Sequence, residues 1–255
     1  MTYCLGMLLA DGLVMIADTR TNAGVDNFSS FKKLHTLADG PDRQIFACSS
    51  GSLSISQSVI GLIQEGLPAA DGGEMNRNLS GVTSMFRAAQ LVGEAVQAAN
   101  RTVGAALAAI NLSSSASLLL GGRIGNAPPA LFQIYSAGNF IECSRETPFL
   151  QIGETKYGKP ILDRGISYET PLPFAVKVGF LSFDSAMRSN LGVARPLDMM
   201  VMRRDPAAPL LTRRIEPDDE YFNDLSLRWA VMLREATDQI PDPPYVSGET
   251  ASPDT

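Results

Sequence analysis

The first eighteen residues, MTYCLGMLLADGLVMIAD (1–18), contain two short apolar runs on either side of Asp11-Gly12. Asp-Gly is the dipeptide most typical of a tight turn between paired strands, so this stretch predicts a β-hairpin that starts almost at Met1. Removal of an initiator methionine requires a small second residue, and Thr2 is small. Removal would leave a free α-amino group and a hydroxyl on Thr2. Because a nucleophile that carries its own base is a known catalytic arrangement, Thr2 is our candidate nucleophile.

The hairpin also determines which residues come near Thr2. With the Asp-Gly dipeptide as a two-residue loop, the numbers of opposed residues sum to 23, which places Thr2 opposite Thr21. Asp18 and Arg20 then lie at the same end of the sheet. A bulge or a longer loop would exchange the faces on which these side chains lie. The pattern therefore predicts that the residues are close together and leaves the direction of their side chains open.

Composition limits the classes of protein to which the chain can belong. Its 255 residues are 45% hydrophobic and 19% charged, as in an ordinary globular protein with a substantial core. The net charge of −6 and the pI near 4.9 argue against nucleic acid or an anionic membrane as the main partner. The N-terminal run lacks a basic region, and no apolar stretch is long enough to span a membrane. We therefore expect a cytoplasmic protein.

The cysteine and histidine counts limit the possible chemistry. Cys4, Cys48 and Cys143 have no metal-ligand spacing, so we interpret them as reduced thiols that are small residues of the core. The chain has one histidine, His35, which rules out a His-rich metal site and leaves one residue for any Ser-His-Asp or Cys-His arrangement. A structural or exposed role is the preferred interpretation of His35. We expect neither a metal nor a cofactor.

Apolar periodicity and turn residues give the order of elements. Strands come first, and then two helices, strands, two helices, strands and one helix. Two stacked antiparallel sheets with helices on their outer faces would bury this pattern, so we predict an α+β fold with four layers, α-β-β-α, in a single domain over 1–240. Residues 241–255 are rich in Pro, Ser, Thr and Gly and are expected to form a disordered tail. Helices are expected over about 52–67, 79–103, 156–165, 172–190 and 218–240, and strands after the hairpin over 31–37, 44–49, 116–120, 130–135, 140–143, 149–153, 199–202 and 210–215.

Several motifs resemble those of one known group of enzymes. They are MTYC at 1–4, ADTRTNAG at 17–24, FKKL at 31–34, QIGETKYGKPILDR at 151–164, RSNL at 188–191 and PLD at 196–198. In this combination the chain resembles the N-terminal nucleophile hydrolases of the proteasome β-subunit and HslV superfamily. Within them it is most similar to the bacterial ancestral β-subunit (Anbu) group. The resemblance extends from residue 1 to about residue 240.

This resemblance implies a threonine peptidase mechanism. The Thr2 hydroxyl would attack a peptide carbonyl, and the α-amine of the same residue would accept the proton. The resemblance implies that Lys33 keeps that amine basic and that a salt bridge to Asp18 holds the lysine in place. It also implies that backbone N–H groups near Cys48 and Ser49 stabilise the oxyanion.

Two neighbouring lysines compete for the catalytic position. Adjacent strand residues point to opposite faces, so Lys32 and Lys33 cannot both enter the site, and periodicity does not choose between them. The family pattern selects Lys33. Arg20 and Ser189 are expected in supporting roles.

The chain departs from the family pattern at two places. Side chains are present at Cys48 or Ser49 where glycine is common, which would narrow the substrate groove. In the loop before 196–198, Gly192 replaces a common serine that orients the threonine amine.

The family forms closed rings or spirals that hide the active sites from folded proteins. A self-compartmentalising homo-oligomer that degrades peptides or unfolded proteins is therefore the first hypothesis, and a dedicated ATPase partner stays open. A small-molecule amidase of the same nucleophile class is the second hypothesis. The third is a ring or spiral scaffold with weak catalysis, which the Gly192 replacement and the side chains at Cys48 and Ser49 favour.

Overall fold

The computed structural model describes residues 2–22, 28–69, 76–110 and 115–246. The chain divides into two compact units, residues 1–217 and 218–255. The first contains both sheets and all of the candidate site residues. The single domain over 1–240 stays a prediction, and the expected disordered tail lies largely outside the described residues, since 247–255 are among those left out.

The first sheet contains the N-terminal hairpin in its centre. Its strand order is β10-β1-β2-β11-β12, and each adjacent pair is antiparallel. β1 and β2 are buried almost throughout because they have neighbours on both edges and layers on both faces. The strands are β1 Tyr3–Leu9, β2 Gly12–Asp18, β10 Phe149–Gly153, β11 Leu197–Arg203 and β12 Leu211–Ile215.

The hairpin is confirmed, but its predicted register is wrong. Leu9 pairs with Gly12 and Cys4 pairs with Ala17, so opposed residues sum to 21 and the turn residues are Ala10 and Asp11. Gly12 begins β2 with φ +151°, and a Cβ there would lie 2.1 Å from the backbone oxygen of Met202 in β11. The glycine is therefore required by the close approach of β11 and not by the turn, which shifts the register by two.

The second sheet has the strand order β5-β6-β7-β8-β9 and is also antiparallel. Lys33 and its neighbours at 31–33 precede β5, although the sequence predicted one strand over 31–37. The two short strands β3 and β4 form a separate hairpin beside the sheets. The strands are β3 Arg20–Asn22, β4 Phe28–Ser30, β5 Leu34–Gly40, β6 Arg43–Gly51, β7 Ala116–Ile124, β8 Ala130–Ile134 and β9 Phe140–Glu142.

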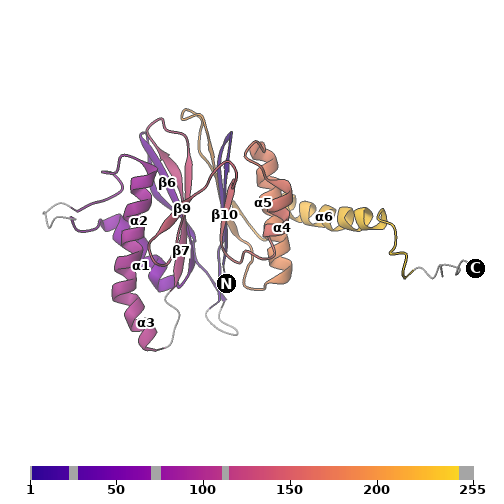
Figure 1. Cartoon of the computed structure of the whole chain (residues 1–255), viewed down its shortest axis with the longest axis horizontal. Helices are drawn as coiled ribbons and strands as arrows, with labels where there is room; N and C mark the ends of the chain where they lie inside the picture. Colours follow the sequence, from indigo (N-terminus) through magenta and orange to yellow (C-terminus); the bar gives the residue numbers. More distant parts are fainter. Residues whose placement is uncertain (1, 23–27, 70–75, 111–114, 247–255) are drawn as a thin grey trace, which may run out of the picture. The chain divides into compact units, whose positions relative to one another are not determined.

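Helices cover the outer face of each sheet, which confirms the four-layer α-β-β-α prediction (Figure 1). α1 (Leu53–Glu65) and α2 (Met85–Ala99) pack on the second sheet, and α2 continues through the π-helical turn η1 (Asn100–Gly104) into α3 (Ala105–Ala109). α5 (Leu172–Ser189) packs on β1 and β2 of the first sheet, with α4 (Lys159–Gly165) beside it.

The predicted helix over 79–103 starts six residues later than expected. Asn78 accepts hydrogen bonds from the N–H groups of Ser80 and Gly81, which forms a turn that competes with the helix. The Ser84 hydroxyl then accepts from the Arg87 N–H and caps α2. The apolar spacing at 79 and 82 therefore reflects two loop side chains that pack against the core, and not a helical turn.

Alternation along each strand separates two layers of core. In β6, Ile45 and Ala47 face the α1–α2 layer, whereas Phe46 and Cys48 face the first sheet. Leu131 lies at the centre of the layer between the sheets, where a Cβ added to Gly6 would approach its methyl groups to 2.8 Å. The close approach of the two sheets thus depends on small residues opposite large ones.

The second unit consists of α6 (Glu220–Asp238) and the residues that follow it. The Asp219 carboxylate caps the helix by accepting from the Phe222 N–H at 2.9 Å. An ion pair between Arg228 and Asp224 spans one turn.

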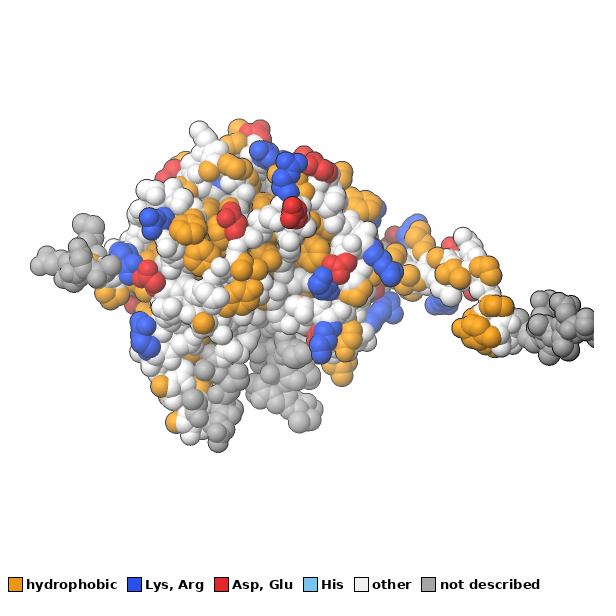
Figure 2. Space-filling model, in the orientation of Figure 1, with side chains coloured by type: hydrophobic (Ala, Val, Ile, Leu, Met, Phe, Trp, Pro, Cys, Tyr) orange, Lys and Arg blue, Asp and Glu red, His pale blue; other side chains and the backbone are white. Residues whose placement is uncertain are grey.

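Figure 2 shows basic and acidic side chains interspersed over the coloured part of the face in view. Among the helices in the described ranges, none is both long and apolar enough to cross a membrane.

Truncation of Leu131 tests the layer between the sheets. Leu131→Ala is expected to lower the free energy of unfolding by about 2–5 kcal/mol, because it removes buried methyl groups and leaves a cavity. Leu211→Ala is the matched control, since Leu211 is 52% exposed and its truncation is expected to change stability by less than about 0.5 kcal/mol. Denaturant titration measures both, and equal losses would contradict this description of the core.

Candidate functional site

The carboxylate of Asp18 joins three segments at the start of β1. Its Oδ1 accepts hydrogen bonds from the Tyr3 N–H and from Lys33 Nζ, each at 2.9 Å. Its Oδ2 accepts from the Arg20 N–H at 3.2 Å. One side chain thus fixes the residue after Thr2, the lysine before β5 and the first residue of β3.

This ion pair is buried. Asp18 is fully buried, and Lys33 is 4% exposed. Burial raises the pKa of Asp18 above its ordinary value, and the attraction of the Lys33 ammonium and the three hydrogen bonds oppose that effect. Lys33 Nζ also donates to the carbonyl oxygen of Arg20. The ammonium is therefore held by two acceptors and directed to the side of the sheet where the chain starts.

Thr2 is half-buried and lies against the end of β10. Its carbonyl oxygen accepts from the Glu154 N–H at 2.6 Å. Gly153 has φ +85°, and a Cβ there would lie 2.0 Å from the same oxygen, so only glycine allows this approach. The backbone of Thr2 is therefore located by two residues of the motif at 151–164.

Glu154 links this corner to the loop after α5. Its carboxylate is buried and accepts from the Lys156 N–H at 3.1 Å and from Asn190 Nδ2 at 2.7 Å. The Oδ1 of Asn190 in turn accepts from the Gly192 N–H at 2.9 Å. The sequence prediction did not include this link, because Glu154 and Asn190 lie 36 residues apart and no local pattern pairs them.

Arg20 reaches the same loop. Its Nη1 donates to the carbonyl oxygen of Leu191 at 3.1 Å, and its backbone contacts both members of the ion pair. Ser189 is the last residue of α5 and is exposed. The structure thus brings Thr2, Asp18, Lys33 and Arg20 to one end of the sandwich, with Ser189 at the edge of the adjoining loop.

Neither Cys48 nor Ser49 is among the residues that line the pocket beside Thr2. Cys48 is fully buried in the layer between the sheets, and burial raises the pKa of its thiol. The Ser49 N–H donates to the carbonyl oxygen of Lys33 at 3.1 Å, so it is already used. These two backbone groups were the expected oxyanion donors, and the described hydrogen bonds do not favour them.

Gly51, two residues further along β6, lies beside Thr2. Both residues line a pocket of about 340 Å³. Ser52 N donates to Ser115 O at 2.8 Å, and antiparallel ladder bonds alternate, so the Gly51 N–H points away from β7. The Gly51 N–H therefore points to the same side of β6 as the Ser49 N–H, which donates to the carbonyl oxygen of Lys33.

His35 lies in β5 beyond Lys33. Burial lowers its pKa, the Lys32 ammonium lowers it further, and Asp198 opposes this effect. Cys4, Cys48 and Cys143 are free and buried. No group of three His, Cys, Asp or Glu that could hold a metal ion occurs among the residues described.

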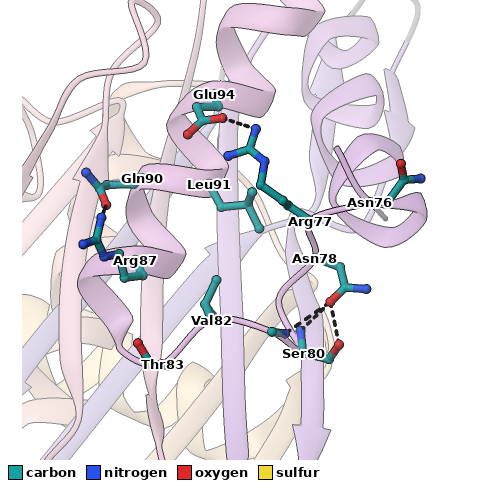
Figure 3. A pocket seen from close by; sticks show the side chains of 11 residues that line it. Asn76, Arg77, Asn78, Ser80, Val82, Thr83, Arg87, Gln90, Leu91 and Glu94 are labelled. Atoms are coloured by element: carbon teal, nitrogen blue, oxygen red, sulfur yellow. Dashed lines mark hydrogen bonds and ion pairs between the residues drawn. The ribbon is translucent and has the colours of Figure 1, made fainter. Parts of the chain in front are cut away.

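A larger pocket, of about 590 Å³, lies apart from Thr2 between residues 76–83 and α2 (Figure 3). The guanidinium of Arg77 pairs with Glu94 across it, and Arg87 Nη1 donates to Gln90 Oε1 at 2.8 Å. Arg77 is thus paired with a carboxylate and Arg87 is bonded to a neutral amide, and we assign no chemistry to this pocket.

Comparison with known proteins identifies the family. Anbu (ancestral β-subunit) from Yersinia bercovieri is 40% identical to the chain, with a TM-score of 0.83, and the match covers 95% of this chain and 98% of that one. The chain belongs to the Anbu family. Anbu from Hyphomicrobium sp. strain MC1 is 42% identical over 94% of this chain and 99% of that one, with a TM-score of 0.84.

The structure described as the helical assembly of the Anbu complex from Pseudomonas aeruginosa is also similar. It is 42% identical over 95% of this chain and 98% of that Anbu chain, with a TM-score of 0.86. No protein-family model matches the chain, and no curated protein matches it either. The resemblance to Anbu seen in the motifs is therefore confirmed by whole-chain similarity.

Removal of the lysine tests the buried ion pair. Lys33→Ala leaves the Asp18 carboxylate buried without its cation and is expected to cost roughly 3–5 kcal/mol of unfolding free energy. The double variant Asp18→Asn/Lys33→Ala removes both charges and is expected to lose less than the sum of the single variants Asp18→Asn and Lys33→Ala. Denaturant titration of all four proteins gives the coupling. Strictly additive losses would show that the two groups do not interact.

The lowered pKa of His35 predicts a pH dependence of stability. Because the unfolded chain binds the proton more readily, this contribution is complete above the ordinary histidine pKa of about 6.5 and is lost as pH falls through the lower, folded pKa. His35→Gln is expected to flatten the decline of melting temperature between about pH 7 and pH 5. Parallel declines in both proteins would remove His35 as the cause.

Proposed function

We propose that this chain is a threonine-type peptidase that hydrolyses peptide bonds with Thr2 after removal of Met1. The single observation that carries the proposal is the shared Oδ1 of Asp18, which accepts from both the Tyr3 N–H and Lys33 Nζ. This oxygen ties an ammonium to the residue directly after the nucleophile. Membership of the ancestral β-subunit family supports the same assignment.

In the proposed mechanism, Thr2 Oγ1 attacks the carbonyl carbon of the substrate, and its proton passes to the α-amine of the same residue. An α-amine has an ordinary pKa of about 7.7–8.0, and a nearby cation such as Lys33 favours its neutral, basic form. The protonated amine then gives its proton to the leaving nitrogen, and an ester on Thr2 results. Water, deprotonated by the amine, hydrolyses the ester and regenerates both groups.

The Gly51 N–H is our proposed oxyanion donor, in place of the N–H groups near Cys48 and Ser49. It belongs to a residue that lines the Thr2 pocket, and the ladder directs it away from β7. A donor of this kind contributes about 2.7–4 kcal/mol to transition-state stabilisation. The Glu154–Asn190 link would keep Thr2 in place while the charge develops.

We further propose a homo-oligomer that encloses these sites, since the Pseudomonas aeruginosa relative is described as a helical assembly. Peptides or unfolded segments would then be the substrates. The free, buried cysteines are in keeping with the reducing cytoplasm as the compartment.

Intact mass spectrometry with an irreversible threonine-directed inhibitor tests the nucleophile. The purified protein is expected to lack Met1 and to gain the mass of one inhibitor per chain. Thr2→Ser keeps a hydroxyl and an α-amine and is expected to be labelled, whereas Thr2→Ala is expected to gain no mass. Retention of Met1, or labelling of Thr2→Ala, would contradict the proposal.

Activity assays on the same purified protein distinguish the peptidase from the two other candidate functions. Turnover of a peptide library without turnover of simple amides supports the peptidase, and the reverse supports an amidase of the same class. An assembled protein with a free Thr2 that no such inhibitor labels would support a scaffold instead.

A further inference from the structure

The pocket beside Thr2 is lined by small residues. Its volume is about 340 Å³, and it lies where β6, β7 and the end of β10 meet. Among the residues that the structure describes, every one that lines it besides Thr2 is serine, glycine or alanine. These residues are Ser50, Gly51, Ser115, Ala116, Ser117 and Gly153.

Hydroxyl and backbone groups supply the polarity of this pocket. None of its lining residues, all of them within the described ranges, carries a charge. Asp18 and Lys33 lie near Thr2, but each is buried and they are paired with one another, so neither offers a free charge to an incoming group. A charged side chain that entered the pocket would lose hydration without gaining a counter-ion.

The backbone keeps the pocket open. A Cβ at Gly51 would lie 2.2 Å from the carbonyl oxygen of Ser115, and Gly51 has φ +96°. At the opposite wall, Gly153 lies against Thr2. A larger residue at either position would strain the backbone and clash with the neighbouring strand or with Thr2. The backbone of the strands therefore fixes the shape of the pocket.

We infer that this pocket holds the side chain of the substrate residue that supplies the scissile carbonyl, and that it selects uncharged, hydrogen-bonding side chains such as Ser, Thr, Asn and Gln. The inference rests on the proposed function, because the carbonyl carbon must bond to Thr2 Oγ1 and its side chain is only two bonds away. A hydroxyl both donates and accepts, so Ser50 and Ser117 can pair with either kind of group on the substrate. A site built to hydrogen-bond a substrate discriminates against a group that leaves its polar atoms unpaired.

The test compares peptide probes that carry one threonine-directed reactive group and differ only in the residue next to it. Rates of mass gain on Thr2 are measured for Asn, Gln, Leu, Lys and Glu probes. The Asn and Gln probes are expected to react about tenfold or more faster than the Lys and Glu probes, with Leu between them. Equal rates, or a preference for a charged probe, would overturn the inference.

A charged substitution in the pocket wall gives a second, independent test of the inference. Ser117→Asp places a carboxylate in the pocket and is expected to raise the ratio of Lys to Glu probe rates at least about tenfold. Ser144→Asp is the matched control. Ser144 is exposed and accepts a hydrogen bond from the Thr147 N–H, which a carboxylate can also do. The ratio of Lys to Glu probe rates for Ser144→Asp is therefore expected to stay at the wild-type value.

The outcomes separate this inference from the proposed function. If no probe labels wild-type Thr2, the proposed function fails. If wild type is labelled at equal rates by all probes, the function stands and the inference fails. If Ser117→Asp does not fold, as circular dichroism would show, the wild-type panel alone decides.

Discussion

The buried carboxylate of Asp18 is the constraint on which the rest of the site depends. It is fully buried, and its two oxygens accept from Tyr3, Arg20 and Lys33, which come from three different segments. A buried carboxylate of this kind is stable only when cations and N–H groups surround it. The start of β1, the start of β3 and the approach to β5 therefore have to meet at one point at the end of the sandwich.

Much of the fold could be predicted because its signals are local. The two apolar runs of the hairpin, the apolar run of β6 and the amphipathic spacing of α5 can each be recognised within one short stretch of sequence. The register of the hairpin could not be predicted in the same way. Gly12 looks like a turn residue in the sequence, but its role is set by β11, a strand almost two hundred residues away.

The candidate site likewise has residues that the sequence could predict and residues that it could not. The predicted hairpin brought Asp18 near Thr2, and the resemblance to a known family selected Lys33; in the structure the side chains of Asp18 and Lys33 form an ion pair at the start of β1. The wall of the pocket and the Glu154–Asn190 link could not be seen, since they join β6 to β7 and β10 to the loop after α5. Serine and glycine carry no chemical signal alone. Only tertiary structure gathers them around Thr2.

Because the ion pair of Lys33 and Asp18 is buried, its strength depends little on the salt concentration of the solution. Mobile ions in solution weaken interactions between exposed charges, surface ion pairs included, but they act much less on charges held away from water. Lys33 and Asp18, each less than one-tenth exposed, are of the second kind. The arrangement at the start of β1 is therefore insulated from changes in ionic strength, whereas the exposed pair of Arg145 and Glu169 is not.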